Sequence, residues 1–111
     1  PANKPKSLDR FNLCTYNKCM NIEFDPAKAE ANMAKHGVSL ALAAEIEWSD
    51  VLCAADTRRD YGELREVGYA AIEQRLYVVV FVQHGETMRI ISLRKANKRE
   101  LKHHEQDNQA Q

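Results

Sequence analysis

The stretch Leu76-Tyr77-Val78-Val79-Val80-Phe81-Val82 is apolar throughout and rich in β-branched residues. A run of this length and composition is typical of a central β-strand that is covered on one or both faces. It is far too short to cross a bilayer, which takes about 20 apolar residues in a helix. The sequence therefore predicts a sheet built around this strand and no membrane partner.

Segments on both sides of this run also have the composition of strands. The polar stretches Glu73-Gln74-Arg75 and Gln83-His84-Gly85-Glu86 have the length of hairpin loops. Consecutive strands joined by such short loops pair in antiparallel fashion. The strands expected beside the central one are 51–55, 65–73 and 88–93.

The N-terminal half predicts a short strand and then a helix. Ile22-Glu23-Phe24 alternates apolar and polar side chains, as a half-buried strand does. Asp25-Pro26 indicates a helix start, because Asp caps the first turn and Pro lacks an N–H that would be unpaired there. The expected apolar stripe of this helix is Ala27, Ala31 and Ala34.

Further capping signals complete the expected fold. Gly37 is typical of the left-handed residue that ends a helix, and Ser39 is expected to cap a second helix that ends near Trp48. Asn97 and Glu100 have the spacing of a capping box at the start of a C-terminal helix. We therefore expect an α+β fold of order β-α-α-β-β-β-β-α, with an antiparallel sheet, the N-terminal helix pair on one face, and part of the other face open to a ligand.

The 111 residues fit one domain, expected over residues 20–105, with a frayed tail over 106–111. Residues 1–19 show no periodicity and no apolar segment of a signal peptide. We expect them to be a disordered leader or an artificial extension before a natural start at Met20, or an extension that orders on a partner. Three cysteines, an odd number without the spacing of a disulfide framework, favour a reducing cytoplasm.

No metal or cofactor is expected. Cys14 and Cys19 do not have zinc-site spacing, even when the histidines are considered with them. Glycines never cluster as they do in a phosphate-binding loop. Cys53 lies inside an apolar strand, so we expect a small buried side chain there rather than a nucleophile.

Charge is balanced overall but unevenly distributed. The formal net charge is zero, with 16 basic and 16 acidic residues. Between Met20 and Asp56 acids dominate, whereas between Thr87 and His104 six Lys and Arg residues accompany only Glu100. This pattern is consistent either with ordinary solvated surfaces or with one surface of strong positive potential that binds nucleic acid.

Glu63 and Arg65 lie two residues apart and therefore share one face of a strand. They could form a plain surface ion pair. They could also be a proton-transfer group beside a phosphate clamp. Cleavage of RNA by the neighbouring 2′-hydroxyl requires removal of a proton, positive charge around the phosphorane, and a proton for the departing 5′-oxygen. Arginine supplies a planar, permanently charged fork for phosphate oxygens.

A second basic cluster surrounds Arg94, which is expected to end the last strand where its side chain reaches the open face. The bases that follow it either keep the C-terminal helix soluble or contact successive phosphates. His36 is also ambiguous, because a histidine near a helix C-terminus is favoured there by the helix dipole alone.

Three motifs resemble the BrnT family of toxins. The opening motif consists of Asp25-Pro26-Ala27-Lys28, Asn32 and Lys35-His36-Gly37-Val38-Ser39. The middle motif is Asp60-Tyr61-Gly62-Glu63-Leu64-Arg65. The closing motif is Arg89-Ile90-Ile91-Ser92-Leu93-Arg94-Lys95-Ala96, followed by Arg99-Glu100. They occur in the family's order and span about residues 20–105.

This resemblance implies a RelE-like fold and a metal-independent endoribonuclease that stalls translation and growth. Its substrate would be mRNA, either free or on the ribosome. It also implies a BrnA-type ribbon-helix-helix antitoxin, which neutralises the toxin in a hetero-oligomer and carries it to operator DNA. Two alternatives are a catalytically inactive binding module of the same fold and a small housekeeping domain without a nucleic-acid role.

The resemblance also assigns roles to residues. It gives proton transfer to Glu63, a phosphate contact to Arg65 and a second cation to Arg94. His103-His104 depart from the pattern, since relatives often have a tyrosine there. The supporting catalytic candidates are Arg58 and Tyr61. The RNA-binding candidates are Lys95, Lys98, Arg99 and Lys102.

Overall fold

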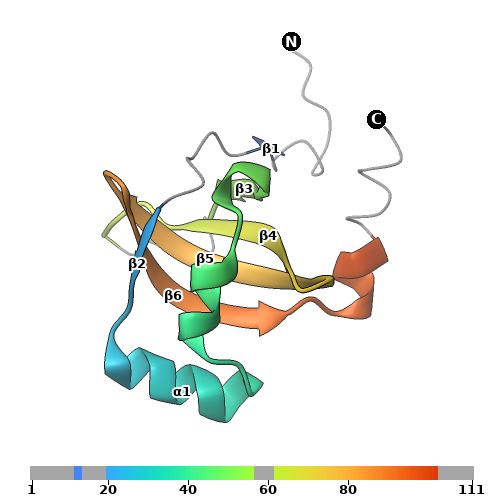
Figure 1. Ribbon diagram of the computed structural model, residues 1–111, viewed down its shortest axis with the longest axis horizontal. Helices are drawn as coiled ribbons and strands as arrows, with labels where there is room; N and C mark the ends of the chain where they lie inside the picture. Colours follow the sequence, from blue (N-terminus) through green and yellow to red (C-terminus); the bar gives the residue numbers. More distant parts are fainter. Residues whose placement is uncertain (1–11, 14–19, 57–61, 103–111) are drawn as a thin grey trace.

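The structure, a computed structural model, describes residues 12–13, 20–56 and 62–102. Its main feature is a six-stranded sheet (Figure 1). In spatial order the strands are β1 (Asn12–Leu13), β3 (Leu52–Ala55), β4 (Glu66–Ile72), β5 (Arg75–His84), β6 (Thr87–Lys95) and β2 (Asn21–Glu23).

The apolar run predicted as the central strand is β5, which lies between β4 and β6. Both of these pairs are antiparallel, as is the pair of β3 and β4. The expectation of a wholly antiparallel sheet is wrong, because β2 runs parallel to β6. No hairpin joins β2 to its neighbour, since the chain leaves β2 into a helix, so no short loop fixes the direction of that pair.

Helix α1 (Pro26–His36) begins and ends where the sequence predicts. The Asp25 side chain accepts a hydrogen bond from the Ala27 N–H at 3.0 Å, and Gly37 ends the helix in the left-handed region at φ 69°. The predicted apolar stripe is wrong, because Ala27, Ala31 and Ala34 are exposed. The inward side instead carries Ala29, which packs on the core, and the buried Asn32.

The predicted second α-helix is absent from the described residues, and two 3₁₀ turns, η2 (Leu40–Glu45) and η3 (Trp48–Asp50), take its place. The buried residues Leu40, Ala43 and Ile46 recur every three positions. That spacing matches the three residues per turn of a 3₁₀ helix better than the 3.6 of an α-helix.

The core lies between these 3₁₀ turns and one face of the sheet (Figure 1). The Trp48 and Phe81 rings meet edge to face there, with centroids 5.0 Å apart. Helix α1 lies along the β6 edge of the sheet and also contacts η2, whereas the 3₁₀ turns cover the core face. The expectation of a helix pair on one face is therefore wrong, and α1 is free to border the opposite face.

The side chain of Asn32 joins α1 to the edge of β6. Its Nδ2 donates to the backbone oxygens of Leu93 at 2.8 Å and Val38 at 2.9 Å, and its Oδ1 accepts from the Leu93 N–H at 3.2 Å. Strand β2 reaches only as far as Arg89 on β6. The amide of Asn32 therefore takes the place of a neighbouring strand for the backbone groups of Leu93.

Cys53 on β3 is partly buried against the core and is disulfide-bonded. The cysteine spacing, which is not that of a disulfide framework, did not predict this bond, and the second sulfur lies outside the described residues. Residues 12–13 of the expected leader form β1 beside β3. The rest of residues 1–19 and the expected tail over 106–111 also lie outside the description. Among the described residues no helix has the length and apolarity to span a membrane.

We predict that Asn32→Asp lowers the free energy of unfolding by about 3 kcal/mol, because a carboxylate cannot donate to the Leu93 and Val38 oxygens and is itself buried. Met33→Ala, at the neighbouring position that is 48% exposed, should change stability by less than about 0.5 kcal/mol. Urea denaturation followed by circular dichroism compares the two variants. Equal effects would show that the Asn32 hydrogen bonds contribute little.

Candidate functional site

The sheet face opposite the core carries Arg94 and Arg89 of β6, and Glu63 and Arg65 lie beside Arg89. Val78, Val80 and Val82 of β5 point to this face, since Tyr77, Val79 and Phe81 point into the core. Paired residues of neighbouring strands share a face. The register therefore places Arg89 beside Val82 and Arg94 beside Val78 on the same side of the sheet.

Strand β6 contains a bulge opposite Val80 and Phe81 of β5. Val80 pairs with Ser92 and Phe81 with Ile90, so Ile91 is an additional residue. The bulge allows Ile91 and Ser92, although consecutive, to border the same open face.

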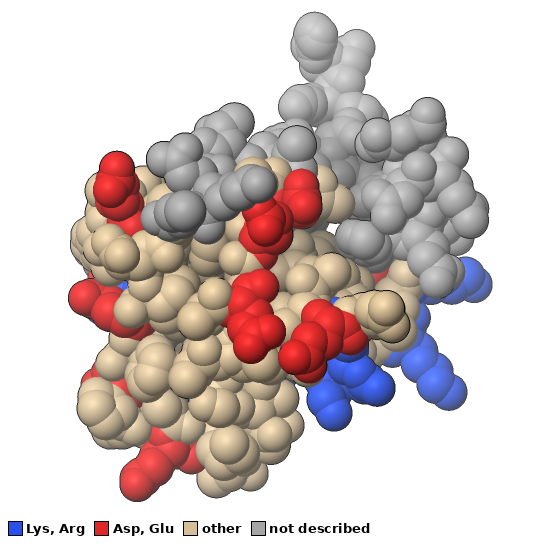
Figure 2. Space-filling model, viewed as in Figure 1, with Lys and Arg blue, Asp and Glu red and all other residues tan. Residues whose placement is uncertain are grey.

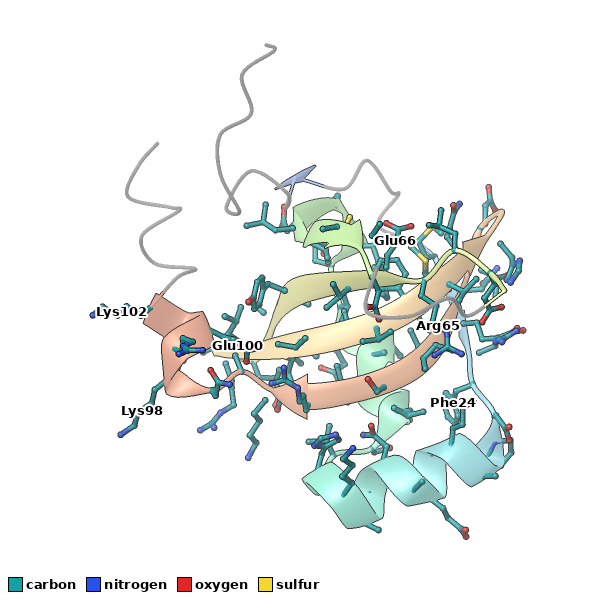
Figure 3. All side chains as sticks on the ribbon, turned by 180° about the vertical axis from the view of Figure 1, so that it is seen from behind. Phe24, Arg65, Glu66, Lys98, Glu100 and Lys102 are labelled. Atoms are coloured by element: carbon teal, nitrogen blue, oxygen red, sulfur yellow. The ribbon has the colours of Figure 1, made fainter. Side chains whose placement is uncertain are left out.

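One cluster of charges lies at the Val82 end of this face. The Glu63 carboxylate is 3.3 Å from Nε of Arg65 and 3.6 Å from a terminal nitrogen of Arg89. All three side chains are partly exposed. The ion pair that the spacing of Glu63 and Arg65 suggested is therefore present, and a second guanidinium joins it. Arg65 lies just before β4, on the right of Figure 3.

The other cluster surrounds Arg94 at the opposite end. Its two terminal nitrogens donate to both carboxylate oxygens of Glu100, at 2.8 and 2.7 Å. Val78 and Val82, the β5 partners of Arg94 and Arg89, are separated by about 13 Å along the strand. The predicted guanidinium groups thus share one face but do not converge on one point.

Glu100 also caps the helical turn of residues 98–102. It accepts from the Asn97 N–H at 2.9 Å, while the Asn97 side chain accepts from the Glu100 N–H at 2.8 Å. The predicted capping box is confirmed. The hydrogen bonds from Arg94, and secondarily the one from Asn97, hold the pKa of Glu100 below its ordinary value despite partial burial.

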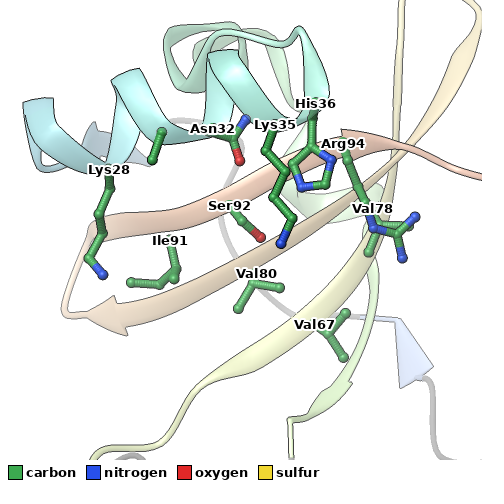
Figure 4. Close-up of a pocket in the computed structure, with 11 residues that line it drawn as sticks. Lys28, Asn32, Lys35, His36, Val67, Val78, Val80, Ile91, Ser92 and Arg94 are labelled. Carbon is green, nitrogen blue, oxygen red and sulfur yellow. The ribbon is translucent and has the colours of Figure 1, made fainter.

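A pocket of about 370 Å³ lies between α1 and the open face of the sheet (Figure 4). The residues that line it are Lys28, Ala31, Asn32, Lys35, His36, Val67, Val78, Val80, Ile91, Ser92 and Arg94. The valines and the isoleucine give it an apolar floor. Within the described part of the chain, no carboxylate lies within ion-pairing distance of Lys28 or Lys35.

His36 shares one end of the pocket with Arg94 (Figure 4). Burial lowers the pKa of His36 below 6.5, and the charges of Lys35 and Arg94 lower it further. The imidazole is therefore mostly neutral at pH 7, so one ring nitrogen can accept a proton.

Lys28, Lys35 and His36 line the pocket, although the sequence did not identify them as site residues. Positions 28, 32, 35 and 36 follow one side of a helix, and the spacing of polar residues around Asn32 is the signal that could have identified this side. The predicted alanine stripe lies on a different side of α1.

The remaining predicted residues extend the basic surface or lie outside the description. Lys102 and Lys98 project from the turn that follows β6 (Figure 3). Figure 2 shows acidic side chains spread over the side of the 3₁₀ turns, with Lys and Arg at the edge where the chain leaves β6. Arg58, Tyr61 and His103-His104 lie outside the described residues. The exposed RNA-binding candidates are Lys95, Lys98, Arg99 and Lys102. The described residues contain no group of three His, Cys, Asp or Glu side chains placed to hold a metal ion.

The chain is similar to a protein family and to a solved structure. A family model described as "Ribonuclease toxin, BrnT, of type II toxin-antitoxin system" matches residues 24–100, which include α1, the pocket and both charge clusters. The crystal structure of the Brucella abortus ribonuclease toxin BrnT is similar, with a TM-score of 0.51 and 21% identity over 72% of this chain and 100% of that one. This likeness concerns the fold. No curated protein matches the chain.

We predict that Glu100→Gln lowers the free energy of unfolding by about 1 kcal/mol at pH 7, because the bond to Arg94 loses its charge. Since the pKa of Glu100 is lowered in the folded state, this contribution is complete above the ordinary pKa of 4.5 and disappears as the pH falls through the folded value. Urea midpoints at several pH values test this. A difference that persists at about pH 2, below both pKa values, would contradict it. Glu86→Gln, at an exposed position, is the control.

Proposed function

Because the chain belongs to the BrnT family of ribonuclease toxins of type II toxin–antitoxin systems, we propose that it is a metal-independent endoribonuclease that cleaves mRNA and inhibits translation and growth. The single observation that carries this proposal is the pocket of Figure 4, where a histidine, an arginine and two lysines border an apolar floor.

The residues at the Arg94 end suit the steps of RNA cleavage. A neutral His36 can accept the proton of the 2′-hydroxyl as this oxygen attacks the phosphorus. Lys35 and Arg94 can stabilise the charge that develops on the phosphorane oxygens, and the Lys35 ammonium can give the departing 5′-oxygen its proton. At the other end, Arg65 and Arg89 are placed to contact another phosphate of the same strand.

Glu63 is the alternative proton-transfer residue, with Arg65 on the phosphate and Arg58 and Tyr61 in support. Its carboxylate already faces two guanidinium groups. Removing that carboxylate from the ion pairs to take up a proton would cost interaction energy, so the geometry favours His36. The pairs of variants below distinguish the two assignments.

We further propose that a BrnA-type ribbon-helix-helix antitoxin neutralises this chain in a cytoplasmic hetero-oligomer that represses its own operon. Family membership supports an antitoxin partner and an RNA substrate. The cysteine count no longer supports a cytoplasmic location, because Cys53 is disulfide-bonded. We place the complex in the cytoplasm because its proposed substrate, mRNA, and the ribosomes are there.

A catalytically inactive module that acts only with its antitoxin in transcriptional autoregulation is the second candidate. The observation in its favour is that Arg65 and Arg94 both contact carboxylates. Under this alternative, the intact chain would bind its antitoxin but would neither degrade RNA in a purified assay nor slow growth when induced.

We predict that His36→Ala and Arg94→Ala each lower the rate of RNA cleavage by about 10²- to 10³-fold, through loss of the base or of phosphorane stabilisation. His84→Ala, at an exposed histidine on β5, should retain the parent rate. Cleavage of a labelled RNA by the purified full chain is the measurement, and activity should survive EDTA. If Glu63→Gln lowers the cleavage rate by a comparable factor while His36→Ala stays active, the proton-transfer residue is Glu63 and not His36.

The same assignment predicts the pH dependence of kcat/KM. A base must be unprotonated, so the rate should fall as acid protonates His36, with a midpoint below 6.5 because the pKa is lowered. Rates measured between about pH 4.5 and 8 test this, and the slow residual activity of His36→Ala should lack that acid limb. An unchanged limb in His36→Ala would exclude His36 as the titrating group.

A further inference from the structure

The floor of the pocket offers almost no polar group to a ligand. Val80 lies in its centre, Val78 lies beside Arg94 at one end, and Val67 and Ile91 complete the apolar lining (Figure 4). The Asn32 amide uses both of its donors and its oxygen on backbone groups. Ser92 is the remaining polar side chain of the floor, and its hydroxyl has no hydrogen-bond partner in the described part of the chain.

The rim has the opposite character. Lys28 and Lys35 extend from α1 along one side, while Arg94 lies at one end. An occupant that matches both surfaces has a flat, weakly polar part on the valines and anionic groups at its sides. A nucleotide within a polynucleotide strand has this distribution, with the base at its centre and a phosphate on either side.

The size and shape of the pocket limit which nucleic acid fits. About 370 Å³ is near the lower end of ligand pockets, which suits one nucleotide rather than a stacked pair. Within a duplex the faces of a base are covered by its stacked neighbours and cannot reach such a floor. Only an unpaired, unstacked base can enter such a pocket, where it would contact the partly exposed Val67 and Ile91, because Val78 and Val80 are only 5% and 7% exposed.

We infer that this pocket is a nucleobase subsite, which takes one unstacked base of single-stranded RNA by shape and apolar contact, with its flanking phosphates on Lys28, Lys35 and Arg94. The inference rests on the proposed ribonuclease function and adds the class of substrate. Because Ser92 alone offers a hydrogen bond to the base, the subsite separates the four bases by no more than about tenfold.

The test is a binding measurement that does not depend on cleavage. The probe is a fluorescent single strand of about eight 2′-deoxynucleotides, which lacks the attacking hydroxyl, and the readout is anisotropy with the intact chain. Two matched probes are the same strand annealed to its complement and the same strand with abasic central residues. We expect each to bind about tenfold more weakly than the intact single strand.

Ser92→Leu fills the pocket and should remove the difference between the intact and abasic strands. Ser49→Leu, at another partly buried serine on η3, should preserve that difference. Val80→Thr, close in shape to the parent residue, supplies a second variant if Ser92→Leu does not fold by circular dichroism. It should reduce the difference by making the floor polar.

Equal affinity for single strand and duplex, or for intact and abasic strands, would overturn the inference. So would a folded Ser92→Leu chain that still distinguishes the intact strand from the abasic one. Failure of the subsite is separable from failure of the proposed function. Cleavage with the expected effect of His36→Ala, but equal binding of all probes, would leave the ribonuclease in place and remove the subsite. If the probes bind as expected but the chain does not cleave RNA, the subsite stands and the proposed ribonuclease function fails.

Discussion

The carboxamide of Asn32 bonds to both backbone groups of Leu93 and to the carbonyl of Val38, and these hydrogen bonds fix the position of α1. An amide is suited to this task because it donates and accepts in one plane, as a strand backbone does. The remainder of the helix has little apolar surface to bury, since Ala27, Ala31 and Ala34 are exposed and Ala29 packs on the core only in part. The helix therefore stays beside β6 and overhangs the open face, where it carries His36.

This constraint gives the two faces of the sheet different roles. The core face is closed by the 3₁₀ turns and by Trp48 against Phe81. The other face keeps an aliphatic floor that no helix of the described residues crosses, and its walls are the edge helix and the bulged end of β6. Arg89 and Arg94 are five residues apart, so strict alternation would place them on opposite faces, and the bulge at Ile91 brings them to the same face.

The elements with strong local signals could be predicted from the sequence, including β5, the hairpins around it, the caps at Asp25 and Gly37, and the capping box at Asn97. The failures have a common cause. Hydrophobic periodicity identified the wrong side of α1 because its anchor is a polar residue, and it suggested an α-helix where the core spacing is three. Glu63, Arg65 and Arg94 could be selected by type. How far apart these residues lie depends on the pairing of β5 with its neighbours and on the bulge in β6. The position of His36 depends on how α1 packs, and local sequence patterns do not specify such tertiary contacts.

Neutral net charge does not oppose a nucleic-acid substrate in this architecture. The exposed acids of the 3₁₀ turns lie on the far side of the sheet from Lys28 and Lys35. A sheet and its packed layer separate groups by about 10 Å, more than the Debye length of about 8 Å at physiological ionic strength. An anion in the pocket therefore experiences chiefly the lysines and Arg94. Glu63 and Glu100 are acids that share this side, and the two bonds from Glu100 fix the guanidinium of Arg94 in place. A phosphate that reaches Arg94 meets an already oriented group, so less side-chain entropy is lost on binding.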